Sequence, residues 1–118
     1  MAGAETRITP SHPVELITPS GTHRLEVAED QFILDRALQA GLDLPHTCLQ
    51  GWCTTCAGRI LEGEVDPSAA LRYYREDREA GYVLLCTARP RGPLRIQTHQ
   101  KEALRANRRK HRLPAPRA

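Results

Sequence analysis

The sequence predicts an α+β fold, in which one main helix packs across a sheet. Two short segments near the N-terminus alternate apolar and polar residues, as half-buried strands do. An amphipathic helical stretch follows them, and the remaining strand-like segments come later and are not separated by long helices. Four or five strands and one main helix, with two strands before the helix and the others after it, indicate the α+β class.

The first strands form a predicted hairpin. Residues 1–13 have no hydrophobic period and are expected to be a flexible arm. Residues 14–18 and 23–27 each alternate, and Pro19 and Gly21 lie between them. Two alternating runs joined by a short Pro/Gly turn are typical of a β-hairpin.

The main helix is predicted over residues 31–40. Its apolar residues recur at helical spacing, which predicts a buried stripe packed on the sheet. Asp30 is the expected N-cap, and Gly41 is the expected C′ residue. The stripe consists of Ile33, Leu34, Ala37 and Leu38.

The second half of the chain holds shorter predicted elements. Asp66-Pro67-Ser68 has the composition of a helix start, because Pro is favoured in the first turn. The mixed charges of residues 75–79 predict a solvated face. The expected elements are strand 59–62, a helix of one or two turns over 69–74, buried strand 82–85, a turn over 90–93 and strand 94–98.

Four cysteines carry the chemistry of the sequence. Cys48, Cys53 and Cys56 have the spacing C-x4-C-x2-C, and Cys86 follows the apolar run that ends at Leu85. This spacing is the one by which four thiolates hold a plant-type [2Fe–2S] cluster. The sequence therefore predicts Cys48, Cys53, Cys56 and Cys86 as the cofactor-binding and metal-ligating residues of one [2Fe–2S] cluster.

Other uses of four cysteines fit less well. Structural zinc sites usually draw on two short C-x2–4-C pairs, whereas three cysteines here share one loop. Two disulfides would suit a secreted protein, and residues 1–13 are too short and too polar for a signal peptide. A redox pair of Cys53 and Cys56 would leave the other two cysteines unexplained.

The residues around the cysteines suit a cluster loop. Small residues allow the backbone to approach the sulfurs closely, and hydroxyl groups can donate hydrogen bonds that tune the potential. The small residues are Gly51, Ala57 and Gly58, and the hydroxyl donors are Thr54 and Thr55.

The length and charge of the chain limit the number and the kind of domains that it can form. With 118 residues it is expected to form one domain, and no apolar stretch approaches the ~20 residues of a membrane helix. Residues 1–100 carry 10 Lys/Arg and 13 Asp/Glu, whereas residues 101–118 carry 7 Lys/Arg and one Glu. A weakly acidic body thus carries a basic C-terminus, and the protein is expected to be soluble and intracellular.

Three segments carry a family resemblance. Leu44 to Gly58, Glu79 to Cys86 and Thr98 to Gln100 resemble the plant and cyanobacterial photosynthetic ferredoxins. The resemblance extends from Val14 to Leu104 and implies a β-grasp fold with a mixed sheet, one main helix across it and a cluster-binding loop. It divides the chain into the arm 1–13, a [2Fe–2S] ferredoxin domain over 14–104 and a basic extension over 105–118.

The resemblance also implies a function. The chain would be a one-electron carrier of low potential and not an enzyme, with Cys48 and Cys53 on one iron and Cys56 and Cys86 on the other. It would be a monomer that docks transiently to donor and acceptor enzymes, in a cyanobacterium-like cytoplasm or the plastid stroma. The alternative is a redox- or iron-sensing regulator that uses the cluster as a switch and the basic tail to bind a partner.

Departures from the family pattern predict a different set of partners. Arg72 stands where the family has an important aromatic residue, and Lys101 stands where the family has an acidic residue. The sequence therefore does not predict docking to a ferredoxin–NADP reductase. Trp52, directly before Cys53, is either a lid over the cluster or a contact for partners. His99 is expected to be a structural hydrogen-bonding residue, because four thiolates already complete the site.

The basic extension favours an acidic protein partner, with an anionic membrane surface as the alternative. It has no aromatic residues interleaved with its cations, which argues against nucleic acid. It is expected to be a solvated segment, helical up to Lys110. Deletion of residues 105–118 should therefore weaken binding of an acidic partner and leave the cluster spectrum unchanged.

Overall fold

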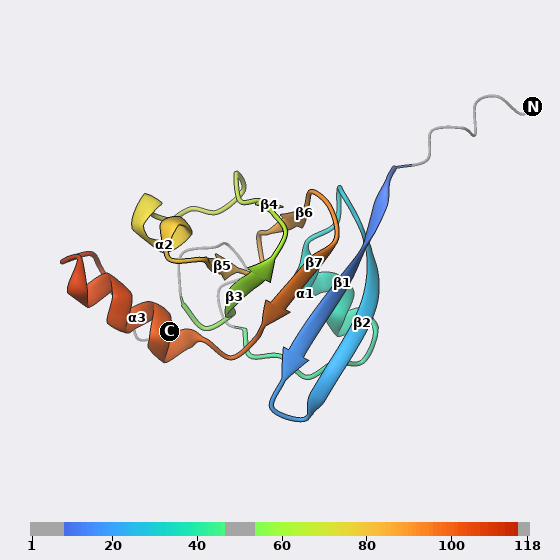
Figure 1. Cartoon of the computed structure of the whole chain (residues 1–118), viewed down its shortest axis with the longest axis horizontal. Helices are drawn as coiled ribbons and strands as arrows, with labels where there is room; N and C mark the ends of the chain where they lie inside the picture. The colour runs from blue at the N-terminus through green and yellow to red at the C-terminus, as the bar shows by residue number, and fades with distance from the viewer. Residues whose placement is uncertain (1–8, 47–53, 116–118) are drawn as a thin grey trace, which may run out of the picture.

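The computed structural model describes residues 9–46 and 54–115, which form a five-stranded mixed sheet in the order β2-β1-β7-β3-β5 and a two-stranded sheet of β4 and β6 (Figure 1). The predicted α+β class is confirmed, with a mixed sheet and few helices. The strands are β1 (Ser11–Thr18), β2 (Gly21–Ala28), β3 (Ala57–Glu62), β4 (Val65–Asp66), β5 (Tyr82–Leu84), β6 (Arg89–Pro90) and β7 (Leu94–Gln97). The helices are α1 (Ile33–Gln39), α2 (Arg75–Glu79) and α3 (Lys101–Lys110).

At the centre of the sheet, β1 from the N-terminal part of the described chain pairs with β7 from its C-terminal part. Strand β1 pairs antiparallel with β2 and parallel with β7, with Val14 opposite Leu94 and Leu16 opposite Ile96. All four side chains are buried, as the alternation of both segments predicts. Strand β1 begins at Ser11, so the sheet already includes the last residues of the segment predicted as an arm.

Helix α1 lies behind the sheet in Figure 1 and buries Ile33, Leu34 and Ala37, so the predicted stripe is part of the core. Gly41 follows the helix with a φ of +86°, which confirms the expected C′ glycine. The predicted N-cap at Asp30 is wrong, because the helix begins at Ile33 and Phe32 precedes it without a side-chain cap.

Backbone carbonyls from a distant segment replace the missing cap. The N–H of Ile33 donates to the carbonyl of Ala88 at 2.9 Å, and the N–H of Leu34 donates to that of Leu85 at 3.0 Å. The first turn of a helix has N–H groups without partners inside the helix, and these two are satisfied by carbonyls on either side of Cys86. Helix α1 therefore fixes the backbone around this cysteine.

The predicted helix over residues 66–74 is wrong. Asp66 ends strand β4, and its carboxylate pairs with Arg89 of β6 at 3.2 Å. The other carboxylate oxygen accepts a hydrogen bond from the N–H of Ser68 at 2.9 Å. The side chain thus stabilises a local turn instead of a helix N-terminus, a known alternative for Asp. Residues 67–74 contain turns and bends.

The charged segment 75–79 is also not wholly solvated. It forms helix α2, in which Asp77 is fully buried against Arg108 of α3, itself fully buried. The prediction that the C-terminal segment is helical up to Lys110 is confirmed, but at Arg108 the expected solvation is wrong. Helix α3 packs beside α2 at one end of the molecule (Figure 1).

Two glycines allow close packing of backbone next to β7. Gly63 has a φ of +95°, and a Cβ there would lie 2.2 Å from the carbonyl oxygen of Pro93. A Cβ on Gly58 would lie 2.9 Å from Cγ2 of Ile96. We expected Gly58 to permit approach to the cluster, and the structure shows that it permits approach of β3 to β7.

Candidate metal centre

Two of the four predicted ligands lie side by side in the interior. The Sγ atoms of Cys56 and Cys86 are 3.2 Å apart, and each residue is only 3% exposed. Cys56 immediately precedes β3, and Cys86 follows the end of β5 by two residues. Strands β3 and β5 pair antiparallel with Ala57 opposite Leu84, so their registry brings the two cysteines together although 30 positions separate them.

Backbone hydrogen bonds hold this cysteine pair from several sides. The N–H of Leu85 donates to the carbonyl of Cys56 at 3.2 Å, which ties the two ligand segments to each other. The N–H of Gln100 donates to the carbonyl of Ala57 at 3.0 Å and brings the start of α3 beside the pair. Together with the two bonds from α1, these contacts hold the backbone next to both cysteines.

The geometry of the pair fits two ligands of one tetrahedral metal. A disulfide would place the sulfurs about 2.05 Å apart, so the pair is not a disulfide. A tetrahedral ion with metal–sulfur bonds of about 2.3 Å separates two thiolates by about 3.8 Å. The observed 3.2 Å is close to this separation and needs only a small side-chain adjustment. The donor chemistry also fits, because thiolates are the ligands that iron–sulfur clusters require.

Buried hydroxyl groups lie next to the cysteines in sequence. Thr54, two residues before Cys56, is fully buried, and Thr87, directly after Cys86, is 4% exposed. The Oγ1 of Thr87 has no hydrogen-bond partner among the described residues. A buried hydroxyl without a partner is unfavourable, so this region of the fold suits an additional acceptor such as a sulfur atom.

The structure locates only part of the remaining predicted site. Cys48, Cys53, Trp52 and Gly51 lie outside the described residues. Within residues 9–46 and 54–115, no group of three or more His, Cys, Asp or Glu side chains could hold a metal ion. Cys56 and Cys86 therefore depend on ligands from elsewhere in the chain to complete a four-thiolate set.

His99 has the structural role expected of it. Its Nδ1 lies 2.7 Å from the hydroxyl of Thr98, and its backbone has a positive φ of 61°. The hydroxyl of Thr98 in turn donates to the carbonyl of Ile17 in β1. The imidazole therefore supports the link between β7 and α3.

Tyr73 attaches the loop before α2 to the strand that leads to Cys86. Its hydroxyl donates to the carbonyl of Tyr82 in β5. Burial raises the pKa of Tyr73 to about 12, and the negative charge of Asp77 adds to the effect. Ionisation of this phenol is therefore disfavoured in the folded protein.

This pKa predicts a loss of stability at alkaline pH. An unfolded tyrosine ionises near pH ~10, so above that pH the unfolded chain releases a proton that the folded chain retains until about pH 12. The free energy of unfolding should then fall as pH rises from about 10 to about 12. Urea unfolding at pH 9 and pH 11 measures this fall, which Tyr73→Phe should reduce. Tyr74→Phe, the matched control, should keep it, and an equal fall in all three proteins would contradict the assignment.

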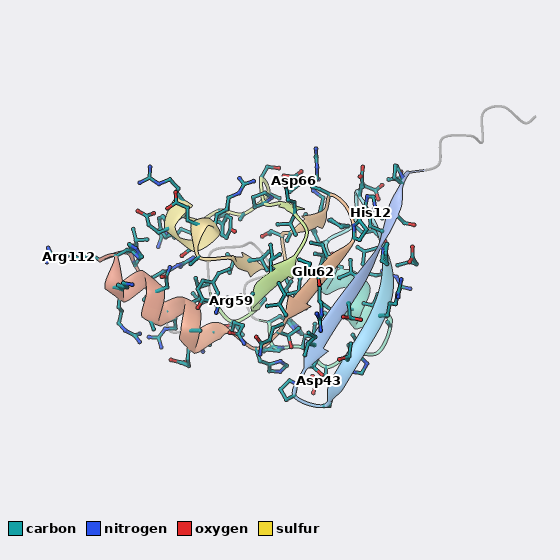
Figure 2. The ribbon with its side chains drawn as sticks, in the orientation of Figure 1. His12, Asp43, Arg59, Glu62, Asp66 and Arg112 are labelled. Atoms are coloured by element: carbon teal, nitrogen blue, oxygen red, sulfur yellow. The ribbon has the colours of Figure 1, made fainter. Side chains whose placement is uncertain are left out.

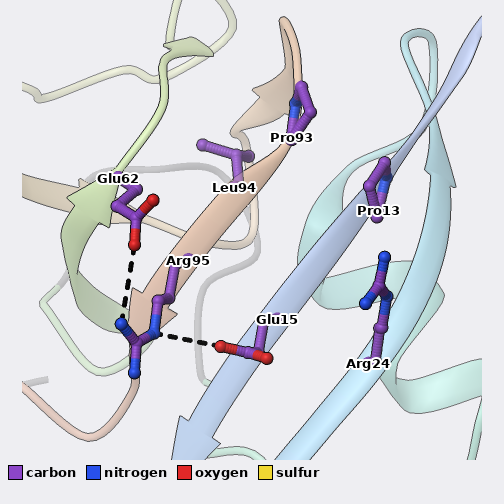
Figure 3. A pocket seen from close by; sticks show the side chains of 7 residues that line it. All are labelled: Pro13, Glu15, Arg24, Glu62, Pro93, Leu94 and Arg95. Carbon is purple, nitrogen blue, oxygen red and sulfur yellow. Dashed lines mark hydrogen bonds and ion pairs between the residues drawn. The ribbon is translucent and has the colours of Figure 1, made fainter.

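A surface cavity of about 210 Å³ lies over strands β1, β2 and β7 (Figure 3). Arg95 there bridges two carboxylates, Glu15 at 3.0 Å and Glu62 at 3.5 Å. None of the described residues that line this cavity is a predicted site residue. Because Arg95, Glu15 and Glu62 are paired with one another, we assign no chemistry to it.

The buried cysteine pair in a β-grasp sheet defines a class, the small iron–sulfur proteins of electron transfer. The chain matches the family profile of the 2Fe-2S iron-sulfur cluster binding domain over residues 17–91. It is 46% identical over 96 residues to Ferredoxin-2 of a Synechococcus strain, covering 81% of this chain and 91% of that protein. The chain belongs to this family of [2Fe–2S] ferredoxins. It carries one [2Fe–2S] cluster and acts as a one-electron carrier.

Further comparisons agree with this assignment. The chain is 42% identical to chloroplastic Ferredoxin-6 of Zea mays, covering 79% of this chain and 61% of that protein. Among solved structures, pectocin M2 matches with a TM-score of 0.73 and 32% identity, over 80% of this chain and 35% of pectocin M2. An Amycolatopsis cytochrome P450 reductase matches with a TM-score of 0.64 and 30% identity, over 73% of this chain and 26% of the reductase. Nothing in these comparisons favours the regulatory alternative.

The sequence interpretation missed the buried pair of Asp77 and Arg108. Arg108 donates to both carboxylate oxygens of Asp77 at 2.9–3.2 Å, and its guanidinium lies 5.0 Å from the centre of the Tyr74 ring. A weak signal was present, because Leu104 and Arg108 are four residues apart and thus share one helix face.

No helix within the described residues is long and apolar enough to cross a membrane.

Proposed function

We propose that Cys48, Cys53, Cys56 and Cys86 hold the cluster, with Cys56 and Cys86 on the same iron. The observation that supports this most directly is the 3.2 Å separation of the Cys56 and Cys86 sulfurs in the core. When bound, the cluster supplies reversible one-electron transfer, and plant-type clusters work near roughly −400 mV. We infer that the chain is not itself an enzyme and that it acts at low potential.

The residues of the chain have three tasks in this function. The registry of β3 with β5 and the first turn of α1 hold the backbone of Cys56 and Cys86. The burial of both cysteines excludes water from their sulfurs. Thr87, next to Cys86 in the sequence, has a buried hydroxyl without a partner among the described residues and so offers a donor, and hydrogen bonds to cluster sulfurs are one determinant of the potential.

The partners of the chain would be proteins that dock transiently. A monomer that gives one electron to an acceptor and then receives one from a donor must release each partner after transfer. The relatives include cyanobacterial and chloroplastic ferredoxins, which supports a cyanobacterium-like cytoplasm or a plastid stroma as the compartment. The basic C-terminal extension, residues 105–118, would bind an acidic partner.

Redox potentiometry on the purified protein, followed by visible absorption and low-temperature electron paramagnetic resonance, tests the proposal. We expect uptake of one electron per chain near the low potentials of plant-type ferredoxins, with a rhombic signal from the reduced cluster. A colourless protein that binds zinc after anaerobic preparation would overturn the proposal. A cluster of much higher potential would contradict the low-potential part of it and would require another donor and acceptor.

A further inference from the structure

Helix α3 carries most of its positive charge on one side. Lys101, Arg105 and Arg109 are spaced four residues apart, so their side chains share one helix face. Arg109 is exposed, as is Arg112 just beyond the helix, whereas Lys101 and Arg105 are half-buried. We call these four residues, Lys101, Arg105, Arg109 and Arg112, the basic stripe. Residues 101–115 contain six Lys/Arg and a single acidic residue, Glu102.

The basic stripe is held in a fixed orientation. Leu104 and Arg108, on the adjoining face of α3, are both fully buried. Arg108 donates to Asp77 of α2 and, at 3.2 Å, to the carbonyl of Arg72. These contacts order the helix before any partner binds, which lowers the entropy lost on docking compared with a flexible tail.

One end of the stripe lies beside the cysteine pair. The N–H of Gln100, next to Lys101, donates to the carbonyl of Ala57, which directly follows Cys56. The other end is at Arg112, at the tip of the molecule in Figure 2. A partner aligned along the stripe would therefore contact the protein close to a proposed cluster ligand.

The rest of the molecule favours the same orientation of an acidic partner. Residues 9–46, which form β1, β2 and α1, carry six Asp/Glu and two Lys/Arg. Asp43 of this segment lies well away from Arg112 in Figure 2. An acidic protein would thus be attracted to α3 and repelled by residues 9–46, which is how charge complementarity raises association rates and selects orientation.

An exposed apolar side chain lies in the segment that is hydrogen-bonded to α3. Leu71 is 68% exposed, and the carbonyl of its neighbour Arg72 accepts a hydrogen bond from Arg108 of α3. Protein interfaces combine a small apolar contact with a polar surround, and Leu71 offers such an apolar contact.

We propose that the basic stripe, together with the exposed Leu71, is the docking surface for a redox partner that presents a surface rich in Asp and Glu. This inference rests on the proposed electron-carrier function and adds to it the surface and the charge of the partner. It also refines the docking role proposed above for residues 105–118: Arg105, Arg109 and Arg112 of that segment belong to the surface, Lys101 is added to it, and the buried Arg108 is not available to a partner.

Electron transfer to two forms of one acceptor tests the surface. Cytochrome c is basic, and succinylation of its lysines makes it acidic without changing the haem. In stopped-flow mixing with the reduced protein at low salt, we expect faster transfer to the succinylated form and a rate that falls as salt rises. Lys101→Gln/Arg109→Gln should slow this transfer about fivefold at low salt, since surface charges act mainly on the association rate.

A matched double variant distinguishes the effect of this surface on the transfer rate from the effect of the net charge of the protein. Arg24→Gln/Arg91→Gln also removes two exposed positive charges, but outside α3, and should change the rate less than about twofold. Equal slowing by both double variants would overturn the proposal. Tighter binding of the protein to anionic phosphatidylserine vesicles or duplex DNA than to succinylated cytochrome c would overturn it as well, because the stripe would then suit another class of polyanion.

The failure of the proposed function would look different. A wild-type protein that reduces neither form of cytochrome c would contradict the electron-carrier role. In that case the equilibrium affinity for succinylated cytochrome c, measured by titration calorimetry, still decides the docking surface. Loss of affinity in Lys101→Gln/Arg109→Gln but not in Arg24→Gln/Arg91→Gln would support it, and equal affinities in all three proteins would contradict it.

Discussion

Cys86→Ala and Cys56→Ala are each expected to eliminate stable cluster binding. In the proposed ligand set, each change would remove one of four thiolates and leave one iron with a single protein ligand. Alanine has no sulfur that could bind iron. Cys56 and Cys86 are the only cysteines among the described residues, so no other described thiol can replace the one that is removed. Iron and acid-labile sulfide per chain, together with the visible absorption of the purified variants, measure the loss.

Thr87→Ser is the control for these cysteine variants. It changes the residue next to Cys86 at an equally buried position but keeps a hydroxyl and removes no ligand. We expect a full cluster content in this variant. If Cys86→Ala kept as much iron and sulfide as Thr87→Ser, Cys86 would not be a ligand and the proposed set would be wrong.

Arg108→Met is expected to destabilise the fold by about 3–5 kcal/mol, the usual effect of removing one partner from a buried ion pair. Asp77 would then remain fully buried without its guanidinium. The contacts of Arg108 with the Arg72 carbonyl and the Tyr74 ring would be lost as well. Thermal unfolding followed by far-ultraviolet circular dichroism, with both proteins in the same cluster state, measures the difference.

The double variant Arg108→Met/Asp77→Leu shows whether the loss comes from the unpaired charge. Replacing a buried ion pair by apolar residues of similar size is often neutral, so the double variant should regain much of the lost stability. Arg109→Met, one residue along the same helix and exposed, is the matched control and should change stability by less than about 0.5 kcal/mol. If Arg108→Met and Arg109→Met had similar effects, the buried pair would not stabilise the fold.

The same pair changes the outcome expected for a truncated chain. From the sequence alone, removal of residues 105–118 should affect only partner binding. The structure shows that this deletion also removes Arg108 and leaves Asp77 buried without its ion-pair partner. Truncation is therefore expected to destabilise α2 and the loop attached to it, and substitutions in the basic stripe are the cleaner test of docking.

The sequence predicted the parts of the fold that depend on local patterns. Alternation located β1, β2 and β7, and the glycine after α1 marked its end, because these signals come from side chains on one face or from a single backbone conformation. Cysteine spacing indicated that all four cysteines bind one cluster, and the family resemblance implied that Cys56 and Cys86 lie on the same iron.

The missed features depend on contacts between distant segments. Asp77 and Arg108 are 31 positions apart. Each lies in a segment rich in charged residues, which on its own is typical of a solvated surface. The missing N-cap of α1 has the same explanation, since the carbonyls of Leu85 and Ala88 replace it from across the fold. No local pattern encodes such partners, whereas burial in the folded structure reveals them.

The position of β7 has a consequence for biosynthesis. It is the last strand of the sheet to leave the ribosome, yet it lies at the sheet centre between β1 and β3. The N–H of Thr98, just after β7, donates to the carbonyl of Ile17, 81 residues earlier in the chain. Until this late segment inserts, β1 and β2 have no sheet to join and the segments of Cys56 and Cys86 lack a central neighbour. The sheet that holds the backbone of Cys56 and Cys86 is therefore completed only after β7 has been synthesised, and a nascent chain that stalls before β7 would lack its central strand.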